Sequence, residues 1–309
     1  MKTVLITGGT GLVGKSLCKQ LVDKGYKVII LTRKMPGGTG QTNIRYAEWN
    51  VASQTIDIAA VQQADYIVHL AGAGVVEKKW TTAYKKEIVE SRTQSSQLLV
   101  NTLKNNSNKI KAVISASAIG WYGADAKPFV KPFVEIDEAD TAFLGETCQL
   151  WEKSIEPICQ LNIRLVKLRT GIVLSNDGGA LLEFKKPIRL GVAGILGNGS
   201  QVVSWIHIDD LCRIFIASIE NERLSGSYNA VAPKPVSNKE LTLLLAKKMK
   251  GKFFIPLHVP EFVLKIMMGD RSIEVLKSAT VSCEKIKEAG FIFMYPSIEA
   301  ALGELCEKS

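Results

Sequence analysis

The sequence VLITGGTGLVG at residues 4–14 decides the fold of this chain. A short apolar run leads into a glycine-rich loop, and a helical pattern follows from 15 to 24, so the loop joins a strand to a helix. In that context glycines allow a tight turn and a close approach of the backbone to a pyrophosphate. N–H groups at the helix N-terminus then face the phosphate charge. We expect a dinucleotide-binding loop with these contact residues: Gly8, Thr10, Gly11, Leu12, Val13 and Gly14.

Short apolar runs continue to alternate with longer helical patterns up to about residue 170. We expect strands at 27–31, 44–49, 66–70, 112–115 and 164–168, and helices at 80–104 and 146–161. Strand, helix, strand in this order is typical of βαβ units. The sequence therefore predicts an α/β fold with a doubly wound parallel sheet of the Rossmann NAD(P)-binding type.

The end of the second strand indicates which nicotinamide cofactor binds. An NAD site usually has Asp or Glu about 20 residues after the glycines, where it binds the ribose 2′-hydroxyl. This chain has Thr32, Arg33 and Lys34 there, with no carboxylate. A hydroxyl and cations suit a 2′-phosphate, which arginine can bind in a bidentate way. We predict NADP(H) as the cofactor; the alternative is that Arg33 is a surface residue and the site does not discriminate.

The second half of the chain is less regular. The glycine-rich segment 171–199 predicts an irregular excursion, and Trp205-Ile206-His207-Ile208-Asp209-Asp210-Leu211 opens a helix with an aspartate near its N-cap. A strand at 228–231 would return to the sheet.

Two prolines at 233 and 235 then mark a boundary. We expect an NADP(H)-binding domain at 1–232 and a smaller C-terminal substrate or cap domain at 233–309, with helices at 238–250, 261–268 and 273–277.

Composition is that of an ordinary globular protein, with 46% hydrophobic and 22% charged residues in 309. The net charge is +9, but no basic block with interleaved aromatic residues is present, so we expect no nucleic-acid partner. Anionic small molecules explain a positive charge as well.

The cysteine spacing and the hydropathy pattern indicate in which cellular compartment the protein works. The six cysteines are widely spaced without a CxxC pair, and there are three histidines, so we predict free thiols and no metal site. The N-terminus opens on a strand, and no apolar stretch reaches the ~20 residues that span a bilayer. We expect a cytoplasmic protein with no membrane partner.

Several motifs together resemble the extended short-chain dehydrogenase/reductase superfamily: TGGTGxxG at 7–14, HLAGA at 69–73 and WIHIDDL at 205–211. Further stretches are closer to an atypical subgroup, the SulA-type "epimerase family" of NAD-dependent epimerase/dehydratase-like proteins. These stretches are 79–81, 87–92, 117–123, 168–174, 204–211, 229–233 and 288–291. The resemblance covers essentially the whole chain. It implies a Rossmann domain with a smaller C-terminal part and NADP(H) binding, but no identified substrate.

The acid/base pair of the superfamily is missing. There a Tyr-x-x-x-Lys pair exchanges the proton with the substrate oxygen. None of the seven tyrosines here is followed four residues later by lysine, and the expected positions fall near Leu144 and Cys148. The resemblance also implies that Arg92 replaces the usual upstream asparagine and that the upstream serine remains as Ser117.

Two residues are candidates for catalysis, each with a second interpretation. Ser117 would polarise a substrate carbonyl, or would only satisfy backbone groups at a strand end. Tyr122 would act as a substitute acid, or would pack in the loop beside the nicotinamide. Cys148 is either a thiol of low pKa beside a cation or buried filling on an apolar helix face.

The resemblance implies further cofactor contacts. Leu70, Ala71 and Gly72 follow the strand at 66–70, and Val173 would border the nicotinamide together with Arg169. Glu87 and Arg92 would contact the cofactor, or would form a surface charge pair on a long helix.

Two functions follow from these observations. The first is an NADP(H)-dependent oxidoreductase or epimerase-like enzyme whose proton comes from Tyr122, Ser117 or an ordered water. The second is a catalytically silent NADP(H)-dependent sensor or regulator that binds a protein partner, as the cell-division label of relatives implies. The small-molecule substrate and the oligomeric state are left open.

Overall fold

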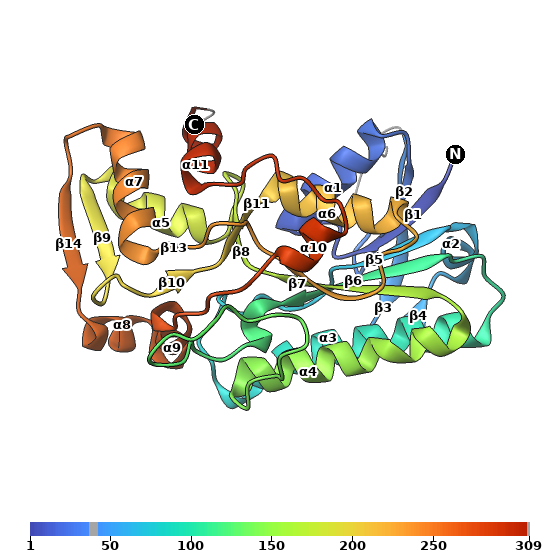
Figure 1. The fold of residues 1–309 in the computed structure, drawn as a ribbon. Helices are drawn as coiled ribbons and strands as arrows, with labels where there is room; N and C mark the ends of the chain where they lie inside the picture. Colours follow the sequence, from blue (N-terminus) through green and yellow to red (C-terminus); the bar gives the residue numbers. More distant parts are fainter. Residues whose placement is uncertain (37–42, 308–309) are drawn as a thin grey trace.

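A computed structural model describes residues 1–36 and 43–307 and is built around one eight-stranded sheet (Figure 1). The strand order is β12-β7-β6-β5-β1-β2-β3-β4, and all neighbours are parallel except β4, which is antiparallel to β3. This confirms the predicted doubly wound parallel sheet, because the order reverses beside β1. The strands are β1 Thr3–Thr7, β2 Lys27–Thr32, β3 Ile44–Asn50, β4 Thr55–Ile56, β5 Tyr66–His69, β6 Ala112–Ala118, β7 Arg164–Thr170 and β12 Gly226–Ala230.

Helices cover both faces of this sheet. α1 (Leu12–Asp23) and α6 (Ile208–Glu220) lie on one face. The other face carries α2 (Ile58–Gln63), α3 (Thr82–Asn105), α4 (Phe143–Ile155) and the 3₁₀ turn η2 (Glu156–Leu161) (Figure 1). Successive strand residues point to opposite faces. Val4 and Ile6 therefore pack in the α1 and α6 core, while Leu5 packs in the other core. Burial on both faces explains why these strands read as continuous apolar runs.

A smaller core lies at one end of the molecule (Figure 1). α5 (Ala180–Arg189), α7 (Asn238–Lys250) and α11 (Ile298–Glu307) pack around β9 (Val192–Leu196), which pairs in parallel with β14 (Ile255–Val259). The expected irregular excursion at 171–199 is therefore wrong, since it contains a strand, a helix and a second strand. Its glycines delimit these elements: Gly179 and Gly191, at the ends of α5, have φ of 74° and 84°.

The expected boundary at residue 232 does not coincide with the division between the cores. The smaller core combines α5 and β9, which precede this position, with α7, which follows it. Two short ladders join the parts: β8 (Ile172–Leu174) with β11 (Trp205–His207), and β10 (Val202–Val203) with β13 (Val236–Ser237).

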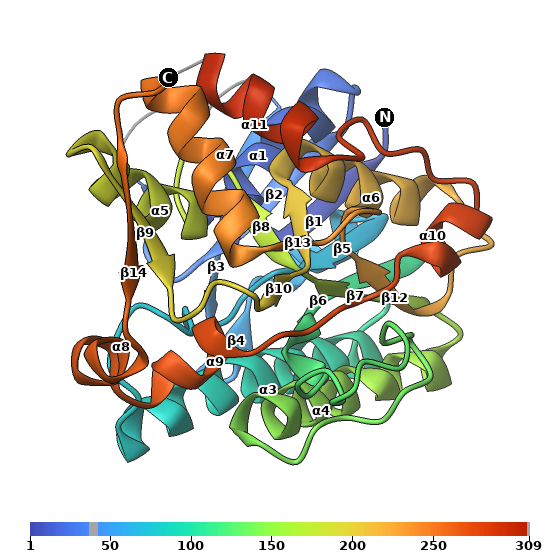
Figure 2. The same ribbon diagram turned by 60° about the vertical axis from the view of Figure 1, so that its left-hand side comes forward.

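The C-terminal segment returns to the large core. After α8 (Glu261–Met268), η3 (Gly269–Arg271) and α9 (Ser272–Leu276), residues 277–283 run past the loop after β6 to α10 (Glu284–Glu288) (Figure 2). Asp125 anchors this passage, because its carboxylate accepts hydrogen bonds from Ser278 Oγ and from the Thr280 N–H and hydroxyl. Ile286 of α10 is buried in the same core as α1 and α6. Among the described residues, no helix is both long and apolar enough to span a bilayer.

Candidate functional site

The glycine loop has the geometry of a phosphate cradle. Gly8 has a φ of 70° and its carbonyl accepts the Gly11 N–H at 3.0 Å. A Cβ added at Gly14 would lie 2.3 Å from the Gly8 oxygen, so only glycine fits there. Gly11 is the N-cap of α1 and supplies no capping side chain. The first N–H groups of α1, at Leu12 and Val13, are thus left to an external acceptor, and Thr10 lies exposed at the crest of the loop.

The end of β5 lies directly against this loop. Leu70 and Ala71 donate their N–H groups to Thr7 Oγ1, each at 3.1 Å. A Cβ on Gly8 would lie 2.9 Å from the Leu70 carbonyl carbon, so the two backbones touch. Gly72 follows, exposed at the same edge of the sheet. The carboxyl ends of β1 and β5 therefore come together, as expected for a doubly wound fold.

His69 supports this junction and is structural. It is fully buried, with Nδ1 2.7 Å from Thr7 Oγ1 and Nε2 3.3 and 3.2 Å from the hydroxyls of Ser95 and Ser96. Both serines donate to backbone carbonyls, so Nε2 carries the proton and Nδ1 accepts from Thr7. Burial, together with the nearby Arg92 charge, lowers the pKa of His69 to about 3, so the ring is neutral at pH 7.

The segment after β8 covers the glycine loop. Cβ atoms built on Gly178 and Gly179 would lie 3.4 and 3.2 Å from the side chain of Leu12. The carbonyl of Val173, a half-buried residue of β8, lies 3.6 Å from the same Gly179 position. Val173 thus belongs to the segment that packs against Leu12, and its contact with the cofactor stays a prediction.

A turn at the end of β2 presents two cations. The Thr32 hydroxyl donates to the Lys34 carbonyl at 2.9 Å and accepts the Lys34 N–H at 3.3 Å. The side chains of Arg33 and Lys34 are exposed. No carboxylate follows within the described part of this turn, up to residue 36.

Glu87 and Arg92 do not pair with each other. Glu87 is exposed and lies 3.4 Å from Lys78. Arg92 donates through Nη1 to the carbonyls of Ala73 and Ile88, at 3.0 and 2.9 Å, beneath the backbone of Gly72. Arg92 therefore supports the cofactor edge from below, whereas the contacts of Glu87 are those of a surface ion pair. A cofactor contact by either residue stays a prediction.

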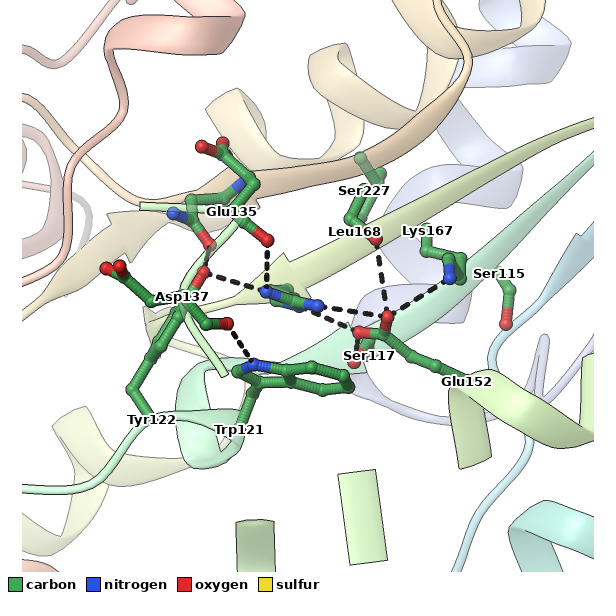
Figure 3. Close-up of polar contacts among 12 residues, drawn as sticks. Ser115, Ser117, Trp121, Tyr122, Glu135, Asp137, Glu152, Lys167, Leu168 and Ser227 are labelled. Carbon is green, nitrogen blue, oxygen red and sulfur yellow. Dashed lines mark hydrogen bonds and ion pairs between the residues drawn. The ribbon is translucent and has the colours of Figure 1, made fainter. Parts of the chain in front are cut away.

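Ser117 belongs to a buried polar network (Figure 3). Its hydroxyl donates to Glu152 Oε1 at 2.7 Å, and Ser117 is 3% exposed. Glu152 also accepts from Arg169 Nε at 2.8 Å and Nη2 at 3.2 Å. Burial would raise the pKa of Glu152, but the hydrogen bonds and charge of Arg169 outweigh it and hold the pKa below its usual value. Since its proton points to Glu152, Ser117 presents only an acceptor to a substrate, contrary to what polarising a carbonyl requires.

Tyr122 is the second predicted catalytic residue, and it lies in the same network. Its hydroxyl donates to Asn229 Oδ1 at 2.7 Å and accepts from Arg169 Nη1 at 3.0 Å. The side chain has no exposed surface, and burial raises its pKa to about 12, although Arg169 opposes this. Its ring stacks on Phe133 at 5.1 Å. These contacts favour the packing role over the role of acid.

Arg169 joins this network to the surrounding loops. Its guanidinium carbon lies 3.6 Å from the centre of the Trp121 ring, and Nη1 donates to the Glu135 carbonyl at 3.1 Å. Arg169 is 3% exposed, and its contacts are those of a buried structural group. A contact between Arg169 and the nicotinamide stays a prediction.

Apolar groups lie at the two positions where the resemblance places the superfamily's acid/base pair. The side chains of Leu144 and Cys148 lie against Gly120, 3.4 and 3.7 Å from a Cβ built there. Burial raises the pKa of Cys148 to about 12 even though the Arg92 charge opposes it. The hypothesis of a reactive thiol of low pKa is therefore wrong for Cys148, which is a neutral packing group.

His207 ties the start of α6 to α11. Its Nδ1 accepts the Asp209 N–H at 3.1 Å, so His207, not an aspartate, is the N-cap. Nε2 therefore carries the proton and lies 3.1 Å from Glu304 Oε2. His207, Asp209 and Glu304 could together hold a metal ion by their spacing. Both ring nitrogens are already engaged, and the cluster is accounted for as a structural tie.

Comparison with known sequences assigns the chain to a protein family. Residues 4–149 match a family model described as the NAD dependent epimerase/dehydratase family, and residues 259–305 match a domain of unknown function. An "Epimerase family protein" of Staphylococcus aureus is 35% identical over 309 residues, covering 100% of both chains. The chain belongs to the epimerase family. The resemblance read from its motifs, to atypical short-chain dehydrogenase/reductases, is thereby confirmed.

Solved structures of epimerase family proteins share its fold. A human epimerase family protein crystallised with NADPH has a TM-score of 0.86 and 28% identity, covering 99% of this chain and 100% of that one. A nucleoside-diphosphate sugar epimerase from Corynebacterium glutamicum has a TM-score of 0.77 and 31% identity; the match covers 99% of this chain and 58% of that one. This chain is thus an NAD(P)-binding protein of the atypical short-chain dehydrogenase/reductase type.

Proposed function

We propose that this epimerase family protein binds NADP(H) and acts as an NADP(H)-dependent oxidoreductase or epimerase-like enzyme. The observation that carries the cofactor choice is the turn at Thr32, which exposes Arg33 and Lys34 and offers no carboxylate to a ribose 2′-hydroxyl. A 2′-phosphate would supply a negative charge for these two cations to bind. The human relative crystallised with NADPH supports the same choice.

The chain's own residues would divide the work of binding. The amides at the start of α1 would hold the pyrophosphate, and Gly8 and Gly14 allow the backbone to approach it. Val173 and the Gly178–Gly179 segment would close over the same loop. When bound, the nicotinamide supplies or accepts a hydride.

The proton in this proposal comes from an ordered water and not from Ser117 or Tyr122. The Ser117 proton is committed to Glu152, and the Tyr122 hydroxyl has both a buried donor and a buried acceptor. Releasing either group would cost about 1–3 kcal/mol for each buried polar atom left unsatisfied.

One observation favours the second function, a silent NADP(H)-dependent sensor that binds a protein partner. Leu144 and Cys148 leave no titrating group at the positions of the superfamily's acid and its lysine. Such a protein would keep the cofactor cradle without turnover.

Cofactor titration tests the first part of the proposal. Binding of NADPH and NADH is measured by cofactor fluorescence for the wild type and for Arg33→Ala/Lys34→Ala. We expect NADPH to bind more tightly, and the double variant to lose at least tenfold in NADPH affinity while NADH is little changed, since each charge-assisted contact contributes about 1.5–3 kcal/mol. Arg223→Ala, an exposed cation before β12, is the matched control. Equal or tighter binding of NADH would contradict the proposal.

Turnover distinguishes the enzyme from the sensor. NADPH oxidation is followed across a panel of sugars, aldehydes and ketones. NADPH oxidation in the presence of any member of the panel supports the enzyme. No oxidation, with a protein partner whose affinity depends on NADPH, supports the sensor.

A further inference from the structure

Two segments of the chain carry cations but no acidic residue. No Asp or Glu occurs between Glu183 and Asp209, nor between Glu240 and Glu261. The two acid-free segments carry seven cations: Lys185, Lys186, Arg189, Lys247, Lys248, Lys250 and Lys252.

The fold brings these two segments to one place. β9 and β14 pair in parallel, with Ile255 opposite Val192, so the turns that precede both strands lie side by side. The Ile255 N–H donates to the Gly191 carbonyl at 2.9 Å. β14 lies at one edge of the molecule (Figure 1). We call the two turns, residues 189–191 and 250–255, the basic tip.

Large apolar side chains protrude from the basic tip. Leu190 is 86% exposed, Phe253 87% and Ile255 69%, and Leu257 continues the same face of β14 at 55%. Isolated exposed apolar residues are common on protein surfaces, but a contiguous group marks an interaction site. No ion pair is recorded for Arg189, Lys250 or Lys252 among the described residues, so cations without carboxylate partners flank this apolar group.

Charge and backbone argue against a second copy of this chain as the occupant. Two basic tips would bring like charges together. Strand addition at β14 is also disfavoured. Because Ile255 turns its N–H to β9, the alternate residues Pro256 and His258 face outward, and Pro256 has no N–H to donate.

We propose that the basic tip docks on an anionic lipid surface. Leu190, Phe253 and Ile255 would enter the boundary between headgroups and acyl chains, and Arg189, Lys250 and Lys252 would lie against the headgroup phosphates. An oligonucleotide would satisfy the cations but would leave the aliphatic side chains in water. This peripheral contact differs from a membrane span and revises the expectation of no membrane partner. It is independent of the proposed cofactor chemistry.

Vesicle co-sedimentation tests this proposal on the full chain. We use vesicles of phosphatidylcholine alone and vesicles with 30% phosphatidylglycerol, at several salt concentrations. We expect binding only to the anionic vesicles, weakening as salt rises. Lys250→Gln/Lys252→Gln should weaken it about 30-fold, the equivalent of about 1 kcal/mol for each cation near the surface. Leu190→Ser/Phe253→Ser should weaken it at least tenfold, since both side chains would leave water.

A matched control removes an equally exposed apolar side chain elsewhere. Ile136 is 90% exposed and stands between Glu135 and Asp137, so Ile136→Ser should leave vesicle binding unchanged. Unaltered thermal midpoints would show that all variants fold. Absence of binding to anionic vesicles overturns the proposal, as does binding that Ile136→Ser reduces as much as Leu190→Ser/Phe253→Ser. A concentration-dependent doubling of mass that Leu190→Ser/Phe253→Ser abolishes would overturn it in favour of a second copy.

Discussion

Replacing Glu152 by glutamine should destabilise the protein far more than the same change one turn later. The Glu152 carboxylate accepts from Ser117, from Arg169 twice, and from Ser227 at 3.3 Å, and lies 3.3 Å from Lys167 Nζ. Glutamine removes the charge and turns a donor towards groups that are themselves donors. Breaking a buried ion pair by removing one partner costs about 3–5 kcal/mol, because the other charge stays buried.

Glu156→Gln is the matched control. Glu156 also pairs with Lys167, at 2.7 Å, but its side chain is 51% exposed. Loss of such a solvent-screened pair should cost less than about 1 kcal/mol.

Equilibrium urea unfolding, followed by tryptophan fluorescence, measures both changes. Trp121 packs on Arg169 and reports on the network itself. The lowered pKa of Glu152 determines how its contribution to stability changes with pH. Its stabilisation is present above the pKa of an unfolded glutamate, about 4.3, and is lost as pH falls through the lower folded value. The wild type and Glu152→Gln should therefore converge in acid. If the two glutamine variants differ by less than about 1 kcal/mol at pH 7, the network does not stabilise the fold as argued.

Three further outcomes are expected. Tyr122→Phe should lower the free energy of unfolding by about 1–3 kcal/mol, because Asn229 and Arg169 lose a buried hydrogen-bond partner. Turnover with any substrate found should not change. A loss of turnover in the folded variant would show that Tyr122 is the acid. Lowering the pH from 7 to 5 should reduce the free energy of unfolding by about 2 kcal/mol through His69. Its pKa of about 3 in the folded protein lies below the ~6.5 of an unfolded histidine, so protonation favours unfolding. A ring resonance of His69 that titrates near pH 6.5 in the folded protein would contradict this. A thiol reagent should label the exposed Cys159 and spare Cys148 until the protein unfolds, and rapid labelling of Cys148 would show the site to be open.

The large sheet could be predicted from sequence because its signals are local. Strands buried on both faces read as apolar runs, and the glycine loop at 8–14 stands where a strand meets a helix. The smaller core could not be predicted in the same way. β14 is exposed along most of its length, and β9 pairs with it across nearly 60 residues, so neither strand has a strong pattern of its own. Glycines at both ends of α5 made this segment read as irregular.

The sequence predicts the residues of the glycine loop one by one, but it does not predict the buried polar network of Ser117, Glu152 and Arg169. One signal was available: Cys148, Trp151, Glu152 and Ile155 share one face of α4, and all four are buried. A glutamate at such a position requires a buried cation. The pairing of β6 with β7 places Ser117 opposite Arg169, and this register makes Arg169 the cation that pairs with Glu152. That register is long-range, and no local pattern encodes it.

The arginine at position 92 and the absence of a lysine at position 148 are linked by charge. Arg92 lies close enough to Cys148 for its charge to act on the thiol pKa. A lysine at 148 would add a second cation beside the half-buried Arg92. Like charges a few ångströms apart repel by about 3 kcal/mol at an effective dielectric constant of ~20. We therefore expect Cys148→Lys to be strongly destabilising alone and Arg92→Asn/Cys148→Lys to recover about 3 kcal/mol of that loss. Urea unfolding of the four proteins of this cycle measures the coupling. Additive effects would show that the two positions changed independently, and that a lysine could return without displacing Arg92.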